Sequence, residues 1–492
     1  MHCCCKLQEK NSNNNNMYAL CERLNFSYIF YSFVSKNTKF SSADPKPPGI
    51  NYPILGSLPY LTKDPHKAIT KYTGDEAMLS LWMGDYYTIV VSDPALVKEI
   101  WNKNFDIFSG RVLTPLGKIL SGSGKNILTS DYENWKPIRS HVSTSFTKTK
   151  LKQLNNIVED HTRQFVNCLK SFEKSGLPLE PNPYLKKFSM NIILMIVFSK
   201  QIPYEESVSE GVAAELISSI EDIFKQTSQG TVLNFLHIFA PVFYLMRNKV
   251  AANFNRCKNF IEEQIYKEKL KDFDPKNPKD LFEELMIEFN DTDTVLRIAT
   301  DLLLGGTDTT STTMHWFLWH MANYPEIQEK MYQEIVEASG KSTFVTNEYR
   351  PKTPYFLAVL KEIMRIKPTA PLGLNRRCDQ DIVIGGYFIP KGTQMLTNQY
   401  GIMRNEKYFP KADQFLPERF MNDQTNDAWI PFGIGQRNCI GLNLAMDELY
   451  IGCTNILMNF KISSYNGKPI PDEEVFGVCL YPKEYQLRLE SR

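Results

Sequence analysis

The sequence lacks the features that mark several common classes of protein. Its 56 Lys and Arg residues nearly balance 55 Asp and Glu residues, giving a net charge of +1. Because acidic and basic residues are interspersed, we expect no concentrated basic surface and no nucleic-acid partner. The ten cysteines form no Cys-x-x-Cys pair and are too sparse for a disulfide framework, so we predict no zinc site and a reducing compartment.

The N-terminal part also lacks an apolar run long enough to span a membrane. Residues 25–35 are rich in aromatic side chains, but they make only about half of the roughly 20 residues that a spanning helix needs. This segment either lies in a membrane interface or packs on the protein. We find no signal peptide and interpret residues 1–44, which include a run of asparagines, as a low-complexity, possibly membrane-associating tail.

The remaining chain is long and apolar enough for a large core, with 492 residues of which 42% are hydrophobic. A proline-rich stretch begins near Pro45 and separates the tail from the folded body. Helical periodicity dominates from residue 131 to about 367, whereas short hairpins are predicted at 79–91 and 382–389 and a last sheet at 475–489. Residues 111–130 show no periodicity and predict a long loop. We therefore predict a mainly α single domain over 45–492 with a minor β portion and no internal repeat.

The most informative stretch is the glycine-rich loop at 432–441, which precedes a helical pattern. Cys439 lies just before the N-terminus of that helix, where backbone N–H groups and the helix dipole favour a thiolate. A thiolate in a loop that other groups can approach closely is a good ligand for a soft or intermediate metal. The alternative is a buried cysteine in an ordinary turn.

A second candidate is the helical pattern around residues 301–316. Gly305 and Gly306 lie inside it, and each costs ~1 kcal/mol relative to alanine, so the pair needs a packing or functional reason. Without two side chains, a flat ligand could lie against the helix, next to the acid Asp308 and the hydroxyl of Thr309. That pair could relay protons. The alternative is a close helix–helix crossing with a chance polar pair.

A third candidate is the pair Glu362 and Arg365, three residues apart on a predicted helix, with Arg419 further along. Such pairs are usually exposed and weak. If buried, one carboxylate and two guanidinium groups would form a network able to fix the cysteine loop.

Taken together, these segments resemble the cytochrome P-450 family. The pattern Phe-x-x-Gly-x-Arg-x-Cys-x-Gly from Phe432 is similar to its haem-binding signature, and residues 305–310 resemble its oxygen-activation motif. Glu362-x-x-Arg365 and residues 417–420 resemble its paired-arginine clamp, and Trp135-x-x-x-Arg139 its haem-propionate helix. All five occur in the family's order, and the resemblance runs from near Pro47 to the C-terminus.

The resemblance implies haem b bound between a long central helix and the Cys439 loop, with Cys439 as axial thiolate. The residues that would bind the cofactor are Trp135, Arg139, Arg376, Phe432, Arg437 and Cys439. Two positions depart from the family: Asn375 replaces a proline before Arg376, and His141 replaces a second arginine after Arg139.

The implied activity is insertion of one oxygen atom of O2 into a small lipophilic substrate, with Asp308 and Thr309 guiding protons. Electrons would come from a separate NADPH-dependent flavoprotein reductase. Eukaryotic members usually lie on the endoplasmic reticulum membrane, so a membrane surface is a possible partner. Two alternatives stay open: a haem-thiolate isomerase or dehydratase acting on a peroxide, and a non-catalytic haem-based binder.

The resemblance also places the substrate-contacting residues. They are expected at 113–127, around Leu303, at 370–374 and at 476–480. These segments are mostly apolar, which fits a lipophilic molecule.

Overall fold

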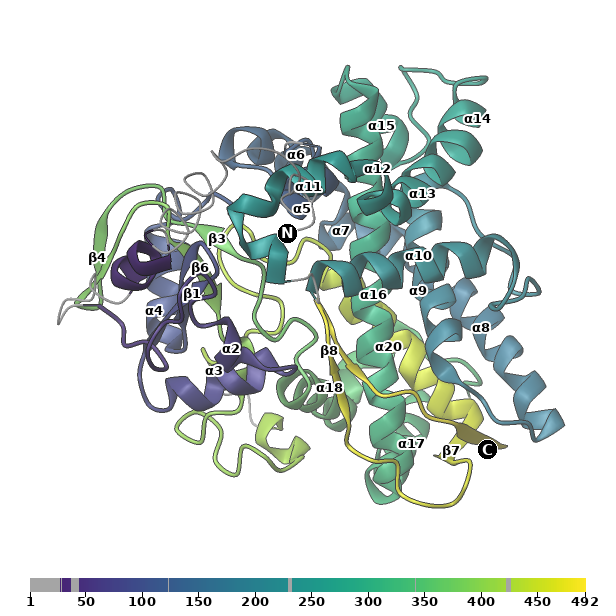
Figure 1. Cartoon of the computed structure of the whole chain (residues 1–492). Coiled ribbons are helices and arrows are strands. Elements are labelled where there is room, and N and C mark those ends of the chain that lie inside the picture. Colours follow the sequence, from purple (N-terminus) through teal and green to yellow (C-terminus); the bar gives the residue numbers. More distant parts are fainter. Residues whose placement is uncertain are drawn as a thin grey trace, which may run out of the picture.

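The computed structural model describes residues 27, 29–36, 44–122, 124–228, 232–340, 342–421 and 426–492. Most of the predicted tail, residues 1–44, lies outside these ranges. The body is mainly helical, with the long helix α16 (Thr292–Asn323) running through its centre and a small β-rich part on one side (Figure 1). The predicted fold class, mainly α with a minor β portion, is confirmed.

The α-helices have these bounds: α2 Leu58–Leu61, α3 Pro65–Thr73, α4 Pro94–Lys98, α5 Pro115–Ser121, α6 Tyr132–Ser145, α7 Lys148–Gln153, α8 Asn155–Ser175, α9 Pro181–Phe198, α10 Gly211–Ser228, α11 Ala240–Leu245, α12 Arg247–Val250, α13 Ala252–Ile261, α14 Lys267–Lys269, α15 Leu281–Glu288, α16 Thr292–Asn323, α17 Pro325–Ser339, α18 Pro354–Ile366, α19 Gln399–Met403 and α20 Leu442–Asn459. π-Helical turns cover Glu99–Lys103 (η1) and Glu262–Tyr266 (η4). Short 3₁₀ turns cover Val232–Phe235 (η2), His237–Phe239 (η3), Asn347–Lys352 (η5) and Pro417–Phe420 (η6).

The strands are β1 Met78–Met83, β2 Tyr86–Val91, β3 Arg376–Arg377, β4 Ile382–Ile384, β5 Tyr387–Ile389, β6 Gln394–Thr397, β7 Phe460–Ser464, β8 Glu474–Phe476, β9 Leu480–Pro482 and β10 Leu487–Ser491. The largest sheet has the order β1-β2-β6-β3, in which β2 and β6 are parallel. The pairs β4–β5, β8–β9 and β7–β10 are antiparallel.

Helix α16 is central because nearly its whole length is buried. It begins where the Asp291 side chain accepts a hydrogen bond from the backbone N–H of Asp293, which satisfies one of the free donors at a helix start. It packs against α9, α18 and α20, and α9 is itself buried almost continuously from Leu185 to Phe198. A helix that is buried on all sides belongs to the core.

The two glycines inside α16 face different surroundings. A Cβ atom built on Gly306 would lie 2.8 Å from Cγ1 of Ile193 on α9, whereas one on Gly305 meets nothing within 4 Å. Gly306 therefore lies where α9 and α16 cross closely, which agrees with the interpretation of the glycine pair as a helix–helix crossing. Gly305 faces open space, which agrees with the other interpretation.

Several local predictions hold, and some fail for identifiable reasons. The hairpins β1–β2 and β4–β5, the central helix and the helix after the cysteine loop are confirmed. The loop predicted over 111–130 is wrong in part, because α5 lies within it, capped by the Thr114 hydroxyl and ended by Gly122 in the left-handed region. The strands β3, β6 and β7 went unpredicted. They are short, and β3 and β6 form only by pairing within the sheet built on β2.

Membrane-spanning helices can be assessed for the residues that the structure describes. None of the helices there combines the length and the apolar composition needed to cross a bilayer.

Replacing each of the two helical glycines by alanine is expected to have opposite effects on stability. Gly305→Ala should gain up to ~1 kcal/mol of helix propensity. In Gly306→Ala the same gain is outweighed by overpacking against Ile193, which typically costs about 1–3 kcal/mol. Urea unfolding followed by circular dichroism measures both free energies. Equal shifts in the two variants would contradict the assignment of Gly306 as the crossing point.

Candidate active site

The cysteine loop is folded by its own backbone. The amide of Cys439 donates to the carbonyl of Phe432 at 2.9 Å, and that of Asn438 donates to Gly435 at 3.0 Å. Gly435 has a φ of +80°, and a Cβ there would lie 2.2 Å from the carbonyl oxygen of Trp101. Only glycine fits such a position, so Gly435 lets the loop fold back, pass close to Trp101 and present Cys439 just before α20.

The Cys439 side chain combines solvent exposure with dense surroundings. It is exposed by surface area, yet desolvation by the surrounding protein raises the pKa of its thiol, while the N–H of Gly441 and the charge of Arg139 lower it. The donated N–H and the nearby cation favour the thiolate form there.

Four arginines, here called the arginine cluster, lie beside this loop: Arg111, Arg139, Arg376 and Arg437. Two of them lie over tryptophan rings, with Arg437 at 4.5 Å from the centre of Trp135 and Arg376 at 4.5 Å from the centre of Trp101. Arg437 donates to the carbonyl of Ser130 at 2.7 Å. Arg139 donates to the carbonyl and the side-chain oxygen of Asn438, both at 2.9 Å, so it holds the residue next to Cys439.

The arginine cluster contains buried positive charge without a matching anion. Among the residues that the structure describes, buried Nη1 of Arg376 and buried Nε and Nη1 of Arg437 have no hydrogen-bond partner. Burial, together with the charge of Arg437, lowers the pKa of Arg376 to about 9. Burial and the charges of Arg111 and Arg139 lower the pKa of Arg437 to about 9, against the opposing effect of Asp131, which itself pairs with Arg377 at 3.2 Å. Unpaired buried cations are costly, so these donors fit a ligand that brings negative charge. Haem, with two propionates, satisfies that requirement.

On the α16 side, the predicted acid and hydroxyl point to different partners. The half-buried Thr309 hydroxyl donates to the carbonyl of Gly305 at 2.8 Å, beside the open space at that glycine. The Asp308 carboxylate is fully buried and accepts a hydrogen bond from the Tyr481 hydroxyl. It also forms an ion pair with Lys186 of α9 at 3.1 Å. The two residues are adjacent in the chain, but their side chains are held by different elements.

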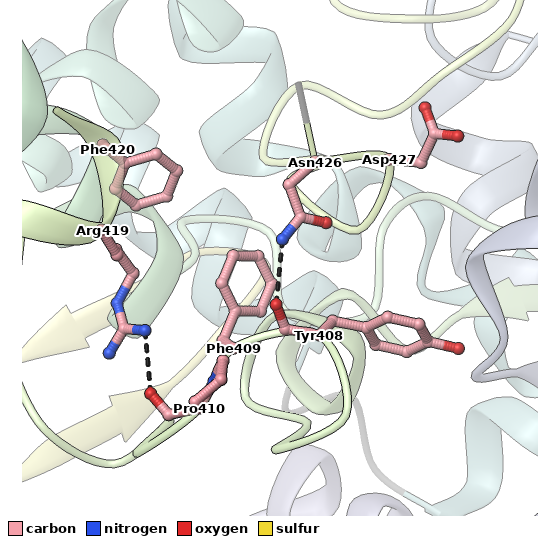
Figure 2. A pocket seen from close by; sticks show the side chains of 7 residues that line it. All are labelled: Tyr408, Phe409, Pro410, Arg419, Phe420, Asn426 and Asp427. Atoms are coloured by element: carbon pink, nitrogen blue, oxygen red, sulfur yellow. Dashed lines mark hydrogen bonds between the residues drawn. The ribbon is translucent and has the colours of Figure 1, made fainter. Parts of the chain in front are cut away.

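The predicted clamp is assembled and buried. Arg365 donates to both Glu362 oxygens at 2.7 and 2.9 Å, and Arg419 donates to Glu362 at 3.1 Å. Glu362 and Arg365 are fully buried, so the alternative of an exposed pair is wrong. Arg419 reaches on to the carbonyl of Pro410 at 2.9 Å (Figure 2).

A surface cavity of about 400 Å³ lies next to the clamp, lined by Tyr408, Phe409, Pro410, Arg419, Phe420, Asn426 and Asp427 (Figure 2). None of the residues predicted to bind haem or substrate lines it.

The structure accounts for both departures from the family pattern. Asn375 binds the segment at residues 111–112. Its backbone carbonyl accepts a hydrogen bond from Arg111, and its side-chain oxygen accepts one from the amide of Val112 at 3.3 Å. The next residue, Arg376, lies in the arginine cluster. His141 instead faces Glu288 at 3.8 Å and takes no part in the cluster.

Three residues of this region were not predicted from the sequence. Arg111 was seen only as the start of a loop, and Lys186 and Tyr481 carried no motif. Lys186 could have been noticed, because two adjacent lysines, 186 and 187, interrupt an otherwise apolar helical stretch.

Comparisons with known proteins agree with this geometry. The family model for cytochrome P450 matches residues 45–489. Two probable cytochromes P450 of Dictyostelium discoideum, 519E1 and 508A1, are each 35% identical, over 94% of this chain and 97% of the relative. A zebra fish cytochrome P450 structure with progesterone aligns with a TM-score of 0.77 at 27% identity, over 87% of this chain and 99% of the other. A second, with abiraterone, gives 0.76 at 28% identity, over 88% and 100%. The chain therefore belongs to the cytochrome P450 family and is a monooxygenase that uses haem with a cysteine thiolate ligand.

Proposed function

We propose that Cys439 supplies the axial thiolate and that the chain oxidises a small lipophilic molecule, within a catalytic domain over residues 45–492. One observation carries the assignment: unpaired buried guanidinium nitrogens of Arg376 and Arg437 lie beside the loop that presents an exposed Cys439. Haem, when bound, supplies the activation of O2. The protein's own residues hold the cofactor, exclude water and deliver protons.

The cofactor-binding residues have distinct roles in this proposal. Arg376 and Arg437 pair with the propionates, since both have free buried donors, and Trp135 supports Arg437 from below. Arg139 acts on the loop, because its Nη1 and Nη2 each donate to Asn438. The Phe432 carbonyl fixes the amide of Cys439, and the clamp of Glu362, Arg365 and Arg419 secures the chain leading to the loop.

Replacing Cys439 tests the axial ligand. Reduced wild-type protein with carbon monoxide should show the long-wavelength Soret band of thiolate ligation, and Cys439→His should lose it because imidazole donates less electron density. Cys257→Ser changes a buried cysteine on α13 and should keep the band. An imidazole-type spectrum in the wild type would refute the ligand assignment.

Asp308 and Thr309 are proposed to deliver protons. Thr309 places a hydroxyl at the open side of α16, next to Gly305. Lys186 pairs with both Asp308 and Glu221, at 3.1 and 2.7 Å, and the Glu221 side chain is 43% exposed. A continuous set of ionisable groups therefore leads from solvent to the residue preceding Thr309. This supports the monooxygenase over the alternative isomerase or dehydratase, which needs no proton from solvent to activate O2.

Thr309→Ala should divert reducing equivalents from product to hydrogen peroxide, because the hydroxyl next to the open space is lost. Thr312→Ala is a matched control: its hydroxyl also donates to a carbonyl one turn back, that of Asp308, but it is fully buried. The measurement is the ratio of product and peroxide to NADPH consumed with a separate NADPH-dependent flavoprotein reductase. Unchanged coupling in Thr309→Ala would exclude Thr309 as the relay.

The partners in this proposal are a lipophilic substrate, O2 and the reductase. The structural relatives bound to progesterone and abiraterone support a substrate of that size and polarity. The side chains of Lys136, Lys148, Lys150 and Lys152 are all exposed near α6 and α7, as a docking face for an acidic reductase surface requires.

A membrane surface is proposed as a further partner, in agreement with an endoplasmic reticulum location. Exposed apolar side chains include Phe30 and Tyr31 in the helical residues 29–36, Ile50, Ile238 and Leu245. Two of the segments that carry them meet at the turn between β1 and β2: the Lys36 ammonium donates to the Gly84 carbonyl at 2.7 Å, and the backbone amide of Asp85 donates to the Phe235 carbonyl at 2.8 Å. Large apolar patches of this kind mark interaction surfaces.

Charge placed on this surface should weaken membrane binding. Leu245→Asp, at a side chain that is 87% exposed, is expected to reduce co-sedimentation with phosphatidylcholine vesicles, because a carboxylate is costly to insert among acyl chains. Leu270→Asp, exposed beyond α14, is the control. Equal sedimentation of both variants and the wild type would argue against the proposed surface.

A further inference from the structure

The hairpin β8–β9 packs directly on the part of α16 that carries Asp308 and Thr309. The backbone of Leu480 is held from both sides: its carbonyl accepts from the Trp316 indole at 2.7 Å, and its amide donates to the Thr369 carbonyl at 2.9 Å. One residue on, the Tyr481 hydroxyl bonds to Asp308. Any movement of this hairpin therefore acts at the edge of the proposed substrate site.

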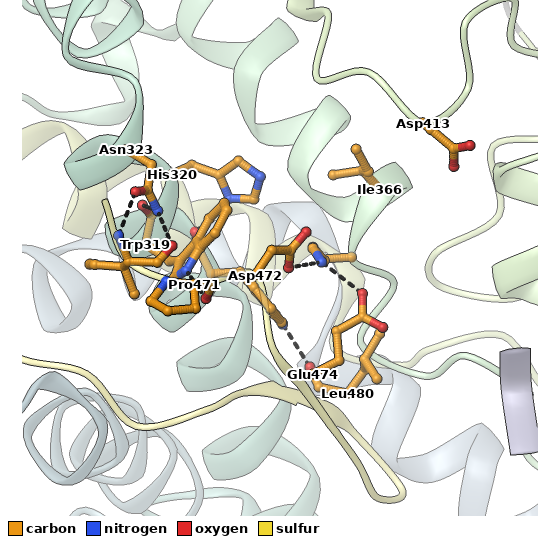
Figure 3. A network of polar contacts seen from close by, with 12 residues as sticks. Trp319, His320, Asn323, Ile366, Asp413, Pro471, Asp472, Glu474 and Leu480 are labelled. Carbon is orange, nitrogen blue, oxygen red and sulfur yellow. Dashed lines mark hydrogen bonds and ion pairs between the residues drawn. The ribbon is translucent and has the colours of Figure 1, made fainter. Parts of the chain in front are cut away.

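The base of the hairpin is fixed by Glu474, whose side chain is only 3% exposed. Its carboxylate lies 2.7 Å from the Lys367 ammonium, 2.7 Å from the Lys67 ammonium and 3.4 Å from Nε2 of His66. Lys67 and His66 come from α3, and Lys367 follows α18. Figure 3 shows Glu474 in the same network as Asp472 and Leu480. One carboxylate thus joins three segments that are far apart in the sequence.

The charge of Glu474 is held strongly in this position. Burial alone would raise the pKa of its carboxyl, but the hydrogen bonds and charges of His66, Lys367 and Lys67 keep it well below its usual range. Lys367 depends on the same contact. Its side chain is 2% exposed and lies 4.4 Å from the centre of the Trp316 ring, and its other carboxylate partner, Asp472, is half exposed.

The contact extends from Glu474 to the aromatic residue at the tip of β8. The ring of Phe476 stacks on His66 at 5.2 Å with an interplanar angle of 9°, and Tyr400 meets the same imidazole edge-on at 4.6 Å. His66 is fully buried. Fixing His66 therefore fixes Phe476, which belongs to the segment 476–480 expected to contact substrate.

We propose that Glu474 is a positioning residue for substrate selection: by gathering His66, Lys67 and Lys367 it sets the place of Phe476 and of the β8–β9 hairpin. Glu474 should therefore influence the affinity for ligands that extend from the haem to the hairpin. It should not influence the affinity for ligands so small that they contact only the haem face. This inference rests on the proposed function, because it assumes that the hairpin borders the substrate site.

Two azoles of different reach test the proposal on the haem-loaded protein. In Glu474→Gln, the optical dissociation constant of the bulky azole clotrimazole should rise about tenfold, while that of imidazole changes by less than about twofold. The matched control is Glu473→Gln, since Glu473 is 54% exposed and pairs with Lys483 of the same hairpin; it should change neither constant. Glu474→Asp keeps the charge and should recover most of the clotrimazole affinity.

Hydrogen exchange gives a readout that does not depend on ligands or turnover. The Leu480 amide should exchange faster in Glu474→Gln than in the wild type or Glu473→Gln, because the hairpin loses its anchor. If Glu474→Gln binds no haem, the same measurements apply to Glu474→Gln combined with Lys367→Met, which removes the stranded cation.

Equal weakening of both azoles, or unchanged clotrimazole affinity and Leu480 exchange, would overturn the proposal. A wild-type protein without a thiolate-type carbon monoxide spectrum would instead overturn the proposed function. Faster Leu480 exchange in Glu474→Gln would then still show that Glu474 anchors the hairpin.

Discussion

The structure depends on how buried charge is neutralised. Removing a charged group from water is costly unless an opposite charge and hydrogen bonds replace the lost hydration. Three buried cations are paired with carboxylates of the protein itself: Arg365 with Glu362, Lys186 with Asp308, and Lys367 with Glu474. Lys186 and Asp308 tie α9 to α16, and Lys367 and Glu474 tie the end of α18 to β8. Glu362 and Arg365 lie on one helix, and Arg419 links Glu362 to η6.

The arginine cluster departs from this rule, and the departure identifies the site. Arg376 is buried and Arg437 half-buried; burial first and then the charge of Arg437 depress the pKa of Arg376, while burial and the charges of Arg111 and Arg139 depress that of Arg437. A protein tolerates such a cluster when a ligand completes it. The cysteine loop lies beside the cluster because Arg437 belongs to the loop and Arg139 holds Asn438. Cofactor binding and folding of this region are therefore coupled through electrostatics.

Helix α16 joins the two functions of the core. On one face, Gly306 allows α9 to approach within the reach of Ile193, and Lys186 from the same helix pairs with Asp308. On the other face, Gly305 leaves room and Thr309 offers a hydroxyl. The two interpretations of the glycine pair, packing and ligand space, are thus both correct, one for each glycine. The β8–β9 hairpin contacts the same helix through Leu480 and Tyr481. The residues proposed to contact substrate, 476–480, and the hydroxyl that holds Asp308 therefore belong to one hairpin.

The sequence by itself determined what depends on neighbours in the chain. The turn that presents Cys439, the helix that follows it, the central helix and the fold class all follow from local glycine placement and periodicity. The tertiary structure alone decided which charges are buried and which partner each one finds. Glu362 and Arg365 looked like an ordinary surface pair. Lys186 and Tyr481 belonged to no motif, because their common partner Asp308 reaches them only when α9, α16 and the hairpin pack. Burial sets the strength of an ion pair, and burial is a property of the folded whole rather than of any segment.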